Sequence, residues 1–428
     1  MGCDTRDRTR QGTARASATR KVSAGARNAA VPSPLRPPSV ATKIVFDGVP
    51  EIRDFPSDER VHRIVAIDNL FQPLTVRSLT VPNRFAMAPM TRQASPGGIP
   101  GADVAEYYRR RAAGGVGLII TEGIRLPIPA AGYPYTIPTL AGDEVLAGWT
   151  RVVDAVHGEG ATIAAQVWHQ GVVRDDADGV VAVSPSGIDG LGQPRGRALE
   201  PDELHRIAEL FARSAATARD VGFDAVELHG AHGFLLDQFL WERTNLRADG
   251  YGGSLAARTR FATEVIAAVR AAVGPDYPII FRFSQWKADD FAASIADNPT
   301  QLAELLTPLA EAGVDVLHPS TRRHYVPAFP DYDRELSLAG WTKKVTGLPV
   351  IAVGSVGLET QFRSEKQGQV IQPAPVDRLV EQFESGEFDV VAIGRALLAD
   401  PAWVKRLRDG ELDGFNGYDA EIALSALT

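Results

Sequence analysis

The sequence predicts an α/β fold, a closed (β/α)8 TIM barrel that follows a disordered N-terminal extension. From Asn69 onward, short apolar runs alternate with longer helical patterns eight times over about 340 residues, which is typical of parallel strands joined by helical crossovers. Glycine and polar residues follow the apolar runs, as they do at the active end of such barrels. An open doubly wound sheet would need a G-x-G-x-x-G turn after an early strand, and none is present there.

The eight repeats can be placed along the chain from the lengths and spacing of their apolar residues. We predict strands at 84–88, 116–121, 161–166, 223–228, 278–283, 314–318, 349–353 and 388–393. We predict helices at 103–113, 143–158, 201–220, 256–273, 300–312, 337–346, 375–385 and 400–408. Two long segments after predicted strands, 167–200 and 319–335, are rich in Gly, Pro, Arg and Tyr, and we expect them to shape a substrate site.

The N-terminal residues differ in composition from the rest. We predict an extension over 1–62, largely disordered to about residue 40, because its Arg, Ala, Ser and Pro content cannot bury enough surface to fold, and a barrel domain over 63–428. The extension lacks the apolar core of a secretory signal. A spacer or mistranslated upstream region, a transit peptide and an assembly arm remain open explanations.

Composition limits the classes of function. Hydrophobic residues make up 44% and charged residues 23% of the chain, and no apolar run approaches the roughly 20 residues of a membrane span. The net charge is −8, and because residues 1–40 hold eight Lys/Arg and two Asp, the remainder carries −14. An acidic body argues against nucleic acid as a partner. The only cysteine, Cys3, leaves no internal disulfide or cysteine-ligated cluster, so we expect a soluble, cytoplasmic protein without a membrane partner.

Polar residues and glycine stand at the ends of the first three predicted strands. Thr91, after Pro89 and Met90, can donate its hydroxyl hydrogen to a ligand or cap a turn. Gly123 would let the backbone approach a flat ligand closely. The side chain of Gln166 offers a paired donor and acceptor for an amide or imide edge, or it bonds inward to a neighbouring strand.

The later strands end in an arginine and in two glycine turns. Arg282 would lie inside or just above the barrel, where a buried guanidinium needs a carboxylate or an electron-rich ligand. Gly354 and Ser355 follow the seventh strand, and Gly394 and Arg395 follow the eighth. Glycine turns and an arginine in these two loops are typical of the phosphate site of barrels.

Two histidines, His229 and His232, stand three positions apart after the fourth predicted strand. As metal ligands they would lack a third partner nearby, so we predict no metal site. As hydrogen-bond donors they could hold a carbonyl oxygen on which negative charge develops. A structural role for the pair remains the third interpretation.

Taken together, these motifs resemble the old yellow enzyme family of FMN-dependent oxidoreductases. The resemblance covers about Leu70 to Leu407. Its motifs are L-F-x-P-L followed by P-N-R at 82–84, A-P-M-T-R at 88–92, A-Q-V-W-H at 165–169, H-G-A-H-G from His229, N-L-R-A-D-G-Y-G-G-S at 245–254 and I-G-R at 393–395.

The resemblance implies where bound FMN would lie. Thr91 would bond near flavin O4 and N5, Gln166 would bind the pyrimidine edge, and Arg282 would lie at N1 and O2. Gly123 would lie against the ring. The implied cofactor-binding residues are Pro89, Met90, Thr91, Gly123, Gln166, Arg282, and, at the phosphate, Gly354, Ser355, Gly394 and Arg395.

The resemblance also implies the reaction. NADPH or NADH would reduce the flavin and leave, and an electron-poor alkene would then accept hydride from N5 at its β-carbon. His229 and His232 would be the catalytic residues, because they would hold the carbonyl or nitro oxygen of this small-molecule substrate. The implied substrate-binding residues are Trp168, Phe234, Tyr133, Tyr135 and Tyr325.

One position departs from the family pattern. Members typically carry a tyrosine two positions beyond the second histidine, as proton donor to the α-carbon, and here that residue is Phe234. Phenylalanine has no proton to donate, so water or a loop tyrosine (Tyr133, Tyr135 or Tyr325) would supply it. Otherwise the acceptor differs, or the reaction is a dehydrogenation or isomerisation.

Other classes are separated by simple features. A non-redox aldolase or isomerase barrel commonly depends on a strand-end lysine or acid, and the nearby Lys287 is expected in a loop past Trp286. A flavin-binding protein without turnover is the third class. Relatives with a cysteine-bound cluster do not match a chain whose single cysteine is Cys3. Family members often form dimers or tetramers, so a homo-oligomer stays open.

Overall fold

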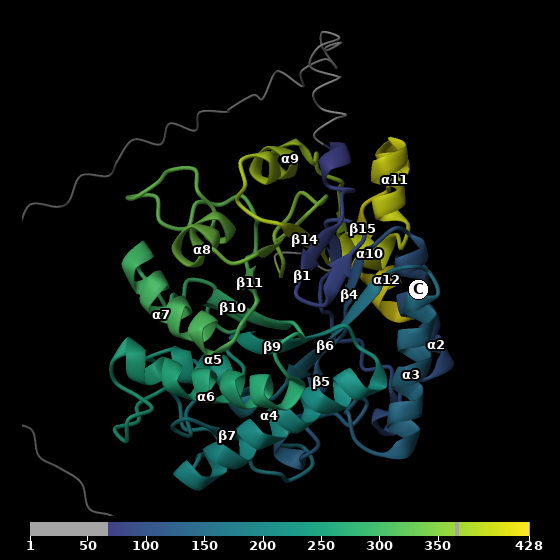
Figure 1. Ribbon diagram of the computed structural model, residues 1–428. Coiled ribbons are helices and arrows are strands. Elements are labelled where there is room, and N and C mark those ends of the chain that lie inside the picture. Colours follow the sequence, from purple (N-terminus) through teal and green to yellow (C-terminus); the bar gives the residue numbers. More distant parts are fainter. Residues whose placement is uncertain (1–66, 364–367, 428) are drawn as a thin grey trace, which may run out of the picture. The chain divides into compact units, whose positions relative to one another are not determined.

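The computed structural model describes residues 67–363 and 368–427, and within them it contains the predicted barrel (Figure 1). Eight parallel strands pair in the order β4-β3-β14-β12-β11-β10-β9-β6, and pairing of β4 with β6 closes the ring. A short ninth strand, β5 (Ile124–Arg125), pairs with β6. The barrel strands are β3 (Phe85–Met87), β4 (Leu118–Ile120), β6 (Thr162–Trp168), β9 (Ala225–His232), β10 (Ile279–Lys287), β11 (Val316–Ser320), β12 (Ile351–Val353) and β14 (Val390–Ile393).

Helices follow the barrel strands and surround them (Figure 1). Residues near its ends cap helix α4. Glu200, just before Pro201, and Glu203 in the first turn form a capping box, and Gly222 ends the helix with φ 108°. The long helices are α2 (Ala102–Ala113), α3 (Asp143–His157), α4 (Pro201–Val221), α6 (Leu255–Val273), α7 (Pro299–Ala312), α8 (Leu338–Thr346), α9 (Asp377–Glu384) and α11 (Trp403–Asp409). The short ones are α5 (Leu235–Leu240), α10 (Arg395–Ala399) and α12 (Ala420–Ser425).

Alternate residues of each strand face the inside of the barrel. On β10, Ile280 belongs to the interior cluster, whereas Phe281 belongs to the cluster that packs against the helices. The lower part of the interior is apolar, and a hairpin of β1 (Leu74–Val76) and β2 (Leu79–Val81) closes that end. The closed end therefore stabilises the fold, and the opposite end is available for a site.

Some predicted boundaries were wrong. β9 runs through His232 and β10 through Lys287, so the histidines and the lysine lie in strands and not in loops. A helix that was not predicted, α5, lies between β9 and the predicted helix at 256–273. These extensions arise because the residues of β9 pair with their neighbours in β10, although glycine interrupts the apolar pattern.

Two small strand pairs were not predicted, and the N-terminal predictions fall outside the described residues. Strand β7 (Val183–Ser184) pairs with β8 (Arg197–Ala198) in the first long insertion, and β13 (Val370–Ile371) pairs with β15 (Tyr418–Asp419). The expected 1–62 extension and its boundary precede the described part of the chain. None of the helices described is both long and apolar enough to cross a bilayer.

Candidate active site

A cavity of about 420 Å³ lies among residues that follow or end the barrel strands. Its volume falls in the range of about 300–1,000 Å³ that is usual for small-molecule and cofactor sites. The predicted site residues that line it are Pro89, Met90, Thr91, Gln166, Trp168, His229, His232, Phe234, Arg282, Gly354, Ser355, Gly394 and Arg395. The structure thus brings together predicted residues from six separate strand ends.

Four predicted residues do not line the cavity. Gly123 packs against Trp168, and a Cβ atom at Gly123 would lie 2.3 Å from that ring. The Tyr135 hydroxyl donates to Asp178 at 2.6 Å, and Tyr325 contacts Arg323. Tyr133, the fourth, stacks edge-on against Tyr135.

A buried carboxylate, Glu227, organises the polar layer inside the barrel. Its Oε1 accepts a hydrogen bond from Gln166 Nε2 at 2.7 Å, and its Oε2 lies 2.6 Å from His318 Nδ1. Burial opposes ionisation, but His318 and Arg282 outweigh it and lower the pKa of Glu227. Burial also lowers the pKa of His318, so a neutral imidazole donates to a carboxylate there. The inward bond expected for Gln166 exists, and the same side chain also lines the cavity.

Arg282 brings a positive charge to the cavity wall. Burial lowers the pKa of Arg282 to about 10, which leaves the guanidinium charged at neutral pH. One terminal nitrogen donates to Ser320 Oγ at 3.2 Å, but its buried Nε has no hydrogen-bond partner among the described residues. An unpaired buried donor on a cation favours an electron-rich ligand.

His229 has the protonation state of a neutral hydrogen-bond donor. Burial and then the charge of Arg282 lower the pKa of His229 to about 3. Its Nδ1 accepts from the backbone N–H of Ala231 at 3.3 Å, so the hydrogen of the neutral ring belongs on Nε2. A neutral imidazole in this tautomer can donate to an oxygen in the cavity.

His232 is held more tightly than His229. Its φ of 63° lies in the left-handed region, which is rare for a residue with a Cβ. The ring stacks on Trp286 at 4.4 Å between centroids, and Nε2 lies 2.8 Å from Ser320 Oγ. Burial lowers the pKa of His232 well below its ordinary value. The two imidazoles lie 5.3 Å apart, so one ligand atom can contact both.

An aromatic wall stands where the family pattern has a hydroxyl. Phe234 packs edge-on against Trp168 at 4.8 Å and against His229 at 4.9 Å. Its ring therefore fills the position next to the histidines without a donor.

The glycine turns form the other end of the cavity. A Cβ at Gly354, whose φ is 147°, would lie 2.6 Å from Thr321 Oγ1, so only glycine fits there. Arg395 donates to Ser355 Oγ at 3.0 Å and to the Thr360 carbonyl at 2.6 Å. Ser355 Oγ also contacts the carbonyls of Arg322 and Thr360. The Arg395 guanidinium and the Ser355 hydroxyl thus come from two different strand ends and meet at this end of the cavity.

Several residues near the cavity were missed. Trp286 and Ser320 line it because β10 and β11 are longer than their apolar runs, and Tyr418 and Leu424 reach it from the C-terminal segment. Ser284 follows Arg282 at a spacing of two residues, and this alternation could have indicated that the strand continues. No motif in the sequence marked the C-terminal residues.

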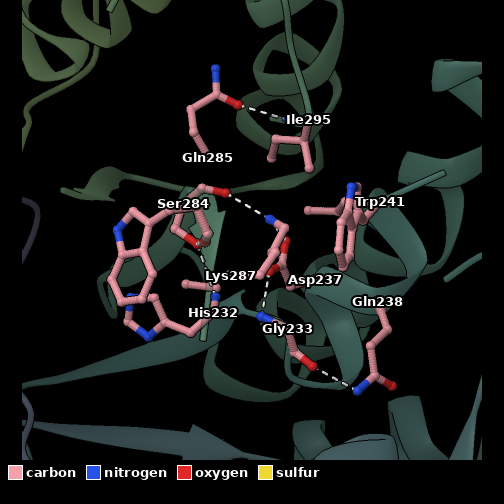
Figure 2. Close-up of polar contacts among 12 residues, drawn as sticks. His232, Gly233, Asp237, Gln238, Trp241, Ser284, Gln285, Lys287 and Ile295 are labelled. Atoms are coloured by element: carbon pink, nitrogen blue, oxygen red, sulfur yellow. Dashed lines mark hydrogen bonds and ion pairs between the residues drawn. The ribbon is translucent and has the colours of Figure 1, made fainter. Parts of the chain in front are cut away.

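A buried ion pair lies behind His232 and away from the cavity lining. Lys287 Nζ lies 2.7 Å from Asp237 Oδ1, and both side chains are fully buried (Figure 2). Sequence reasoning missed the pair because Lys287 was expected in a loop. Within the described residues, no group of three or more His, Cys, Asp or Glu side chains is arranged to hold a metal ion.

Comparison with known proteins identifies the family. The model of the NADH:flavin oxidoreductase / NADH oxidase family matches residues 69–413. An NADH oxidase from Thermoanaerobacter brockii is 37% identical over 358 residues, 80% of this chain and 51% of that protein, so the chain spans about half its length. 12-oxophytodienoate reductase 7 from Oryza sativa subsp. japonica is 32% identical over 362 residues, 79% of this chain and 87% of that protein.

The structural comparison agrees. Morphinone reductase in complex with tetrahydroNAD superposes with a TM-score of 0.69 at 31% identity, over 83% of this chain and 94% of that one. The barrel prediction and the resemblance are both confirmed. The chain belongs to the NADH:flavin oxidoreductase / NADH oxidase family, the family of the old yellow enzymes.

Proposed function

We propose that this protein is an FMN-dependent NAD(P)H oxidoreductase that reduces electron-poor alkenes such as enones and nitroalkenes. The observation that carries the proposal is that two imidazoles, His229 and His232, line the same cavity as the buried Arg282. Both rings are neutral at pH 7 because burial lowers their pKa values. Neutral imidazole donors can bind a carbonyl oxygen without a preceding proton transfer.

The cavity residues fit FMN. The unpaired Nε of Arg282 offers a donor to an electron-rich ring edge, and Gln166 offers a paired amide edge whose orientation Glu227 fixes. Thr91 would bond the ring from the first strand end, and Gly354, Ser355, Gly394 and Arg395 would hold the phosphate. When bound, FMN supplies hydride transfer from the nicotinamide donor to the alkene.

The protein's own part in the reaction is positioning and polarisation. His229 Nε2–H and the His232 ring would draw electron density from the substrate oxygen, which makes the β-carbon more electrophilic. Trp168 and Phe234 would pack against the substrate and exclude water from part of the cavity. Arg282 would stabilise negative charge next to Gln166.

Anaerobic spectroscopy tests this function. The purified protein should be yellow, should bleach when NADPH or NADH is added, and should regain colour with cyclohexenone, a nitroalkene or a maleimide but not with cyclohexanone. A colourless protein that does not take up added FMN would refute the proposal. If NADPH or NADH bleaches the flavin but no alkene restores its colour, the protein would be a flavin oxidoreductase that does not reduce alkenes.

Phe234 favours a second candidate, in which the acceptor differs or the reaction is a dehydrogenation or isomerisation. Phe234 lines the cavity, whereas Tyr133, Tyr135 and Tyr325 do not. In simple alkene reduction, water or another hydroxyl group of the cavity wall, such as that of Tyr418, would then deliver the α-carbon proton. Stopped-flow reoxidation by cyclohexenone distinguishes the sources: an unchanged rate in each Tyr→Phe variant supports water, and a large fall in one assigns that tyrosine. No reoxidation at all, together with turnover of another acceptor, supports the second candidate.

A further inference from the structure

The buried pair of Lys287 and Asp237 needs an explanation that the proposed reaction does not supply. Neither side chain lines the cavity, and both are completely removed from solvent. Burying two ions is expensive, and an apolar pair of similar size is often as stable, so such a pair is weak support for a purely stabilising role.

The other hydrogen bonds of the two side chains go to the backbone of Gly233, next to His232, and of Ser284 on the neighbouring strand β10 (Figure 2). Asp237 Oδ2 accepts from the N–H of Gly233 at 2.6 Å. Lys287 Nζ donates to the carbonyl of Ser284 at 2.9 Å. Ser284 Oγ in turn accepts from the N–H of His232 at 2.9 Å. The two ions therefore connect the segment that carries His232 to the end of β10.

The backbone at this point departs from regular strand geometry on both strands. His232 has φ 63°, and the β9–β10 register shifts between Phe283 and Lys287, where Lys287 pairs with His232. A residue with a Cβ stays in the left-handed region only where its surroundings enforce it. The enforcing contacts here come from Ser284, Asp237 and Lys287.

The same geometry directs the ring. Because His232 is in this conformation, its imidazole stacks on Trp286 and reaches Ser320 Oγ at 2.8 Å, in the wall of the cavity. His229, three residues earlier, also lies within β9.

We propose that Lys287 and Asp237 are positioning residues that hold His232 in its left-handed conformation and so set how tightly the substrate oxygen is bound. The proposal rests on the proposed function, because it takes His232 as a ligand for that oxygen. Its test must separate positioning from folding.

The double variant Lys287→Met/Asp237→Leu removes both ions and leaves no unpaired buried charge. Cyclohexenone is titrated into the oxidised FMN-loaded enzyme, and binding is followed by the visible flavin absorbance. We expect the Kd to rise about tenfold, and to rise less than about twofold when the same change is made in His232→Ala, because coupled residues are non-additive. The Tm and the FMN content should stay close to those of the wild type.

Two further variants sharpen the test. Lys287→Met/Asp237→Asn also removes both charges but keeps an acceptor for Gly233, and it should lose less binding than Lys287→Met/Asp237→Leu. Lys343→Met removes the lysine of another 2.7 Å ion pair, with Asp389, away from the cavity lining, and should leave the Kd unchanged. Equal losses in both His232 backgrounds, or no loss in the wild-type background, would overturn the proposal.

A crystal structure of the double variant gives a readout that does not depend on the substrate. If His232 leaves the left-handed region and its ring moves, the positioning role holds; if φ stays near its present value, the role is wrong. A wild-type enzyme that carries FMN but binds no enone would instead count against the proposed function.

Discussion

The two ends of the barrel interior obey the same geometry but hold opposite chemistry. On β10, Ile280 packs into the apolar layer at the closed end, and Arg282, two residues later on the same face, lines the cavity. The closed end gains stability from buried apolar surface. The open end instead buries charged and polar groups, among them Glu227 and Arg282, at a cost in stability. Period-two alternation therefore decides which residues face the interior, and their depth along the strand decides whether they stabilise the fold or line the site.

Of the variants that test this difference between the two ends, Glu227→Leu should have the largest effect. It removes the acceptor for Gln166 and His318 deep in the barrel, and breaking one side of such a network costs about 3–5 kcal/mol of unfolding free energy. Urea unfolding of the flavin-free protein measures it. Glu227→Gln, which keeps an acceptor, is the control and should lose less. An equally stable Glu227→Leu protein would mean that the polar layer does not contribute to the fold.

His229→Ala should separate function from stability at the open end. We expect kcat/KM for cyclohexenone to fall by about 10²–10³, the usual loss for one donor to a developing oxyanion. The unfolding free energy should change by less than about 1 kcal/mol, because the ring already borders a cavity. Steady-state kinetics per bound flavin and urea unfolding test the two parts. A large loss of unfolding free energy with unchanged kcat/KM would instead assign His229 a structural role.

Acid should lower the unfolding free energy through the titratable groups at the open end, whereas the apolar closed end should not contribute. The folded pKa of His229 is lowered from 6.5 to about 3, so below pH 6.5 the unfolded chain binds a proton that the folded protein does not. Stability is therefore lost as the pH falls from about 6.5 towards 3, by about 2 kcal/mol for this one group at pH 5. Urea unfolding gives the unfolding free energy at pH 7 and at pH 5. Between these two pH values, His229→Asn should lose about 2 kcal/mol less than the wild type. The same loss in both proteins would contradict the neutral state of His229.

Ile280→Val should give the smallest effect. Removing one methylene from the fully buried layer at the closed end should cost about 0.5–1.5 kcal/mol. Turnover per bound flavin should not change, because Ile280 does not line the cavity. Thermal unfolding and kinetics of the same preparation check both. Altered turnover would show that the two ends are coupled.

Much of the barrel could be predicted because its signals are local. Apolar periodicity, the capping box at Glu200 and the glycine after α4 depend on neighbours in sequence. The strand-end residues Thr91, Gln166 and Arg282 were found for the same reason, since the ends of parallel barrel strands meet at one face. Tyr133, Tyr135 and Tyr325 lie outside the cavity lining, and no local pattern in the sequence indicates where a long loop returns.

From the sequence alone came the eight-fold alternation, the family and thirteen of the residues that line the cavity. Tertiary structure alone decided that β9 and β10 continue through His232 and Lys287, that Gly123 accommodates Trp168, and that Lys287 meets Asp237. The physical reason is that periodicity reports which side of an element is buried. Strand length, register shifts and buried ion pairs depend instead on partners that lie about 50 residues away in the chain.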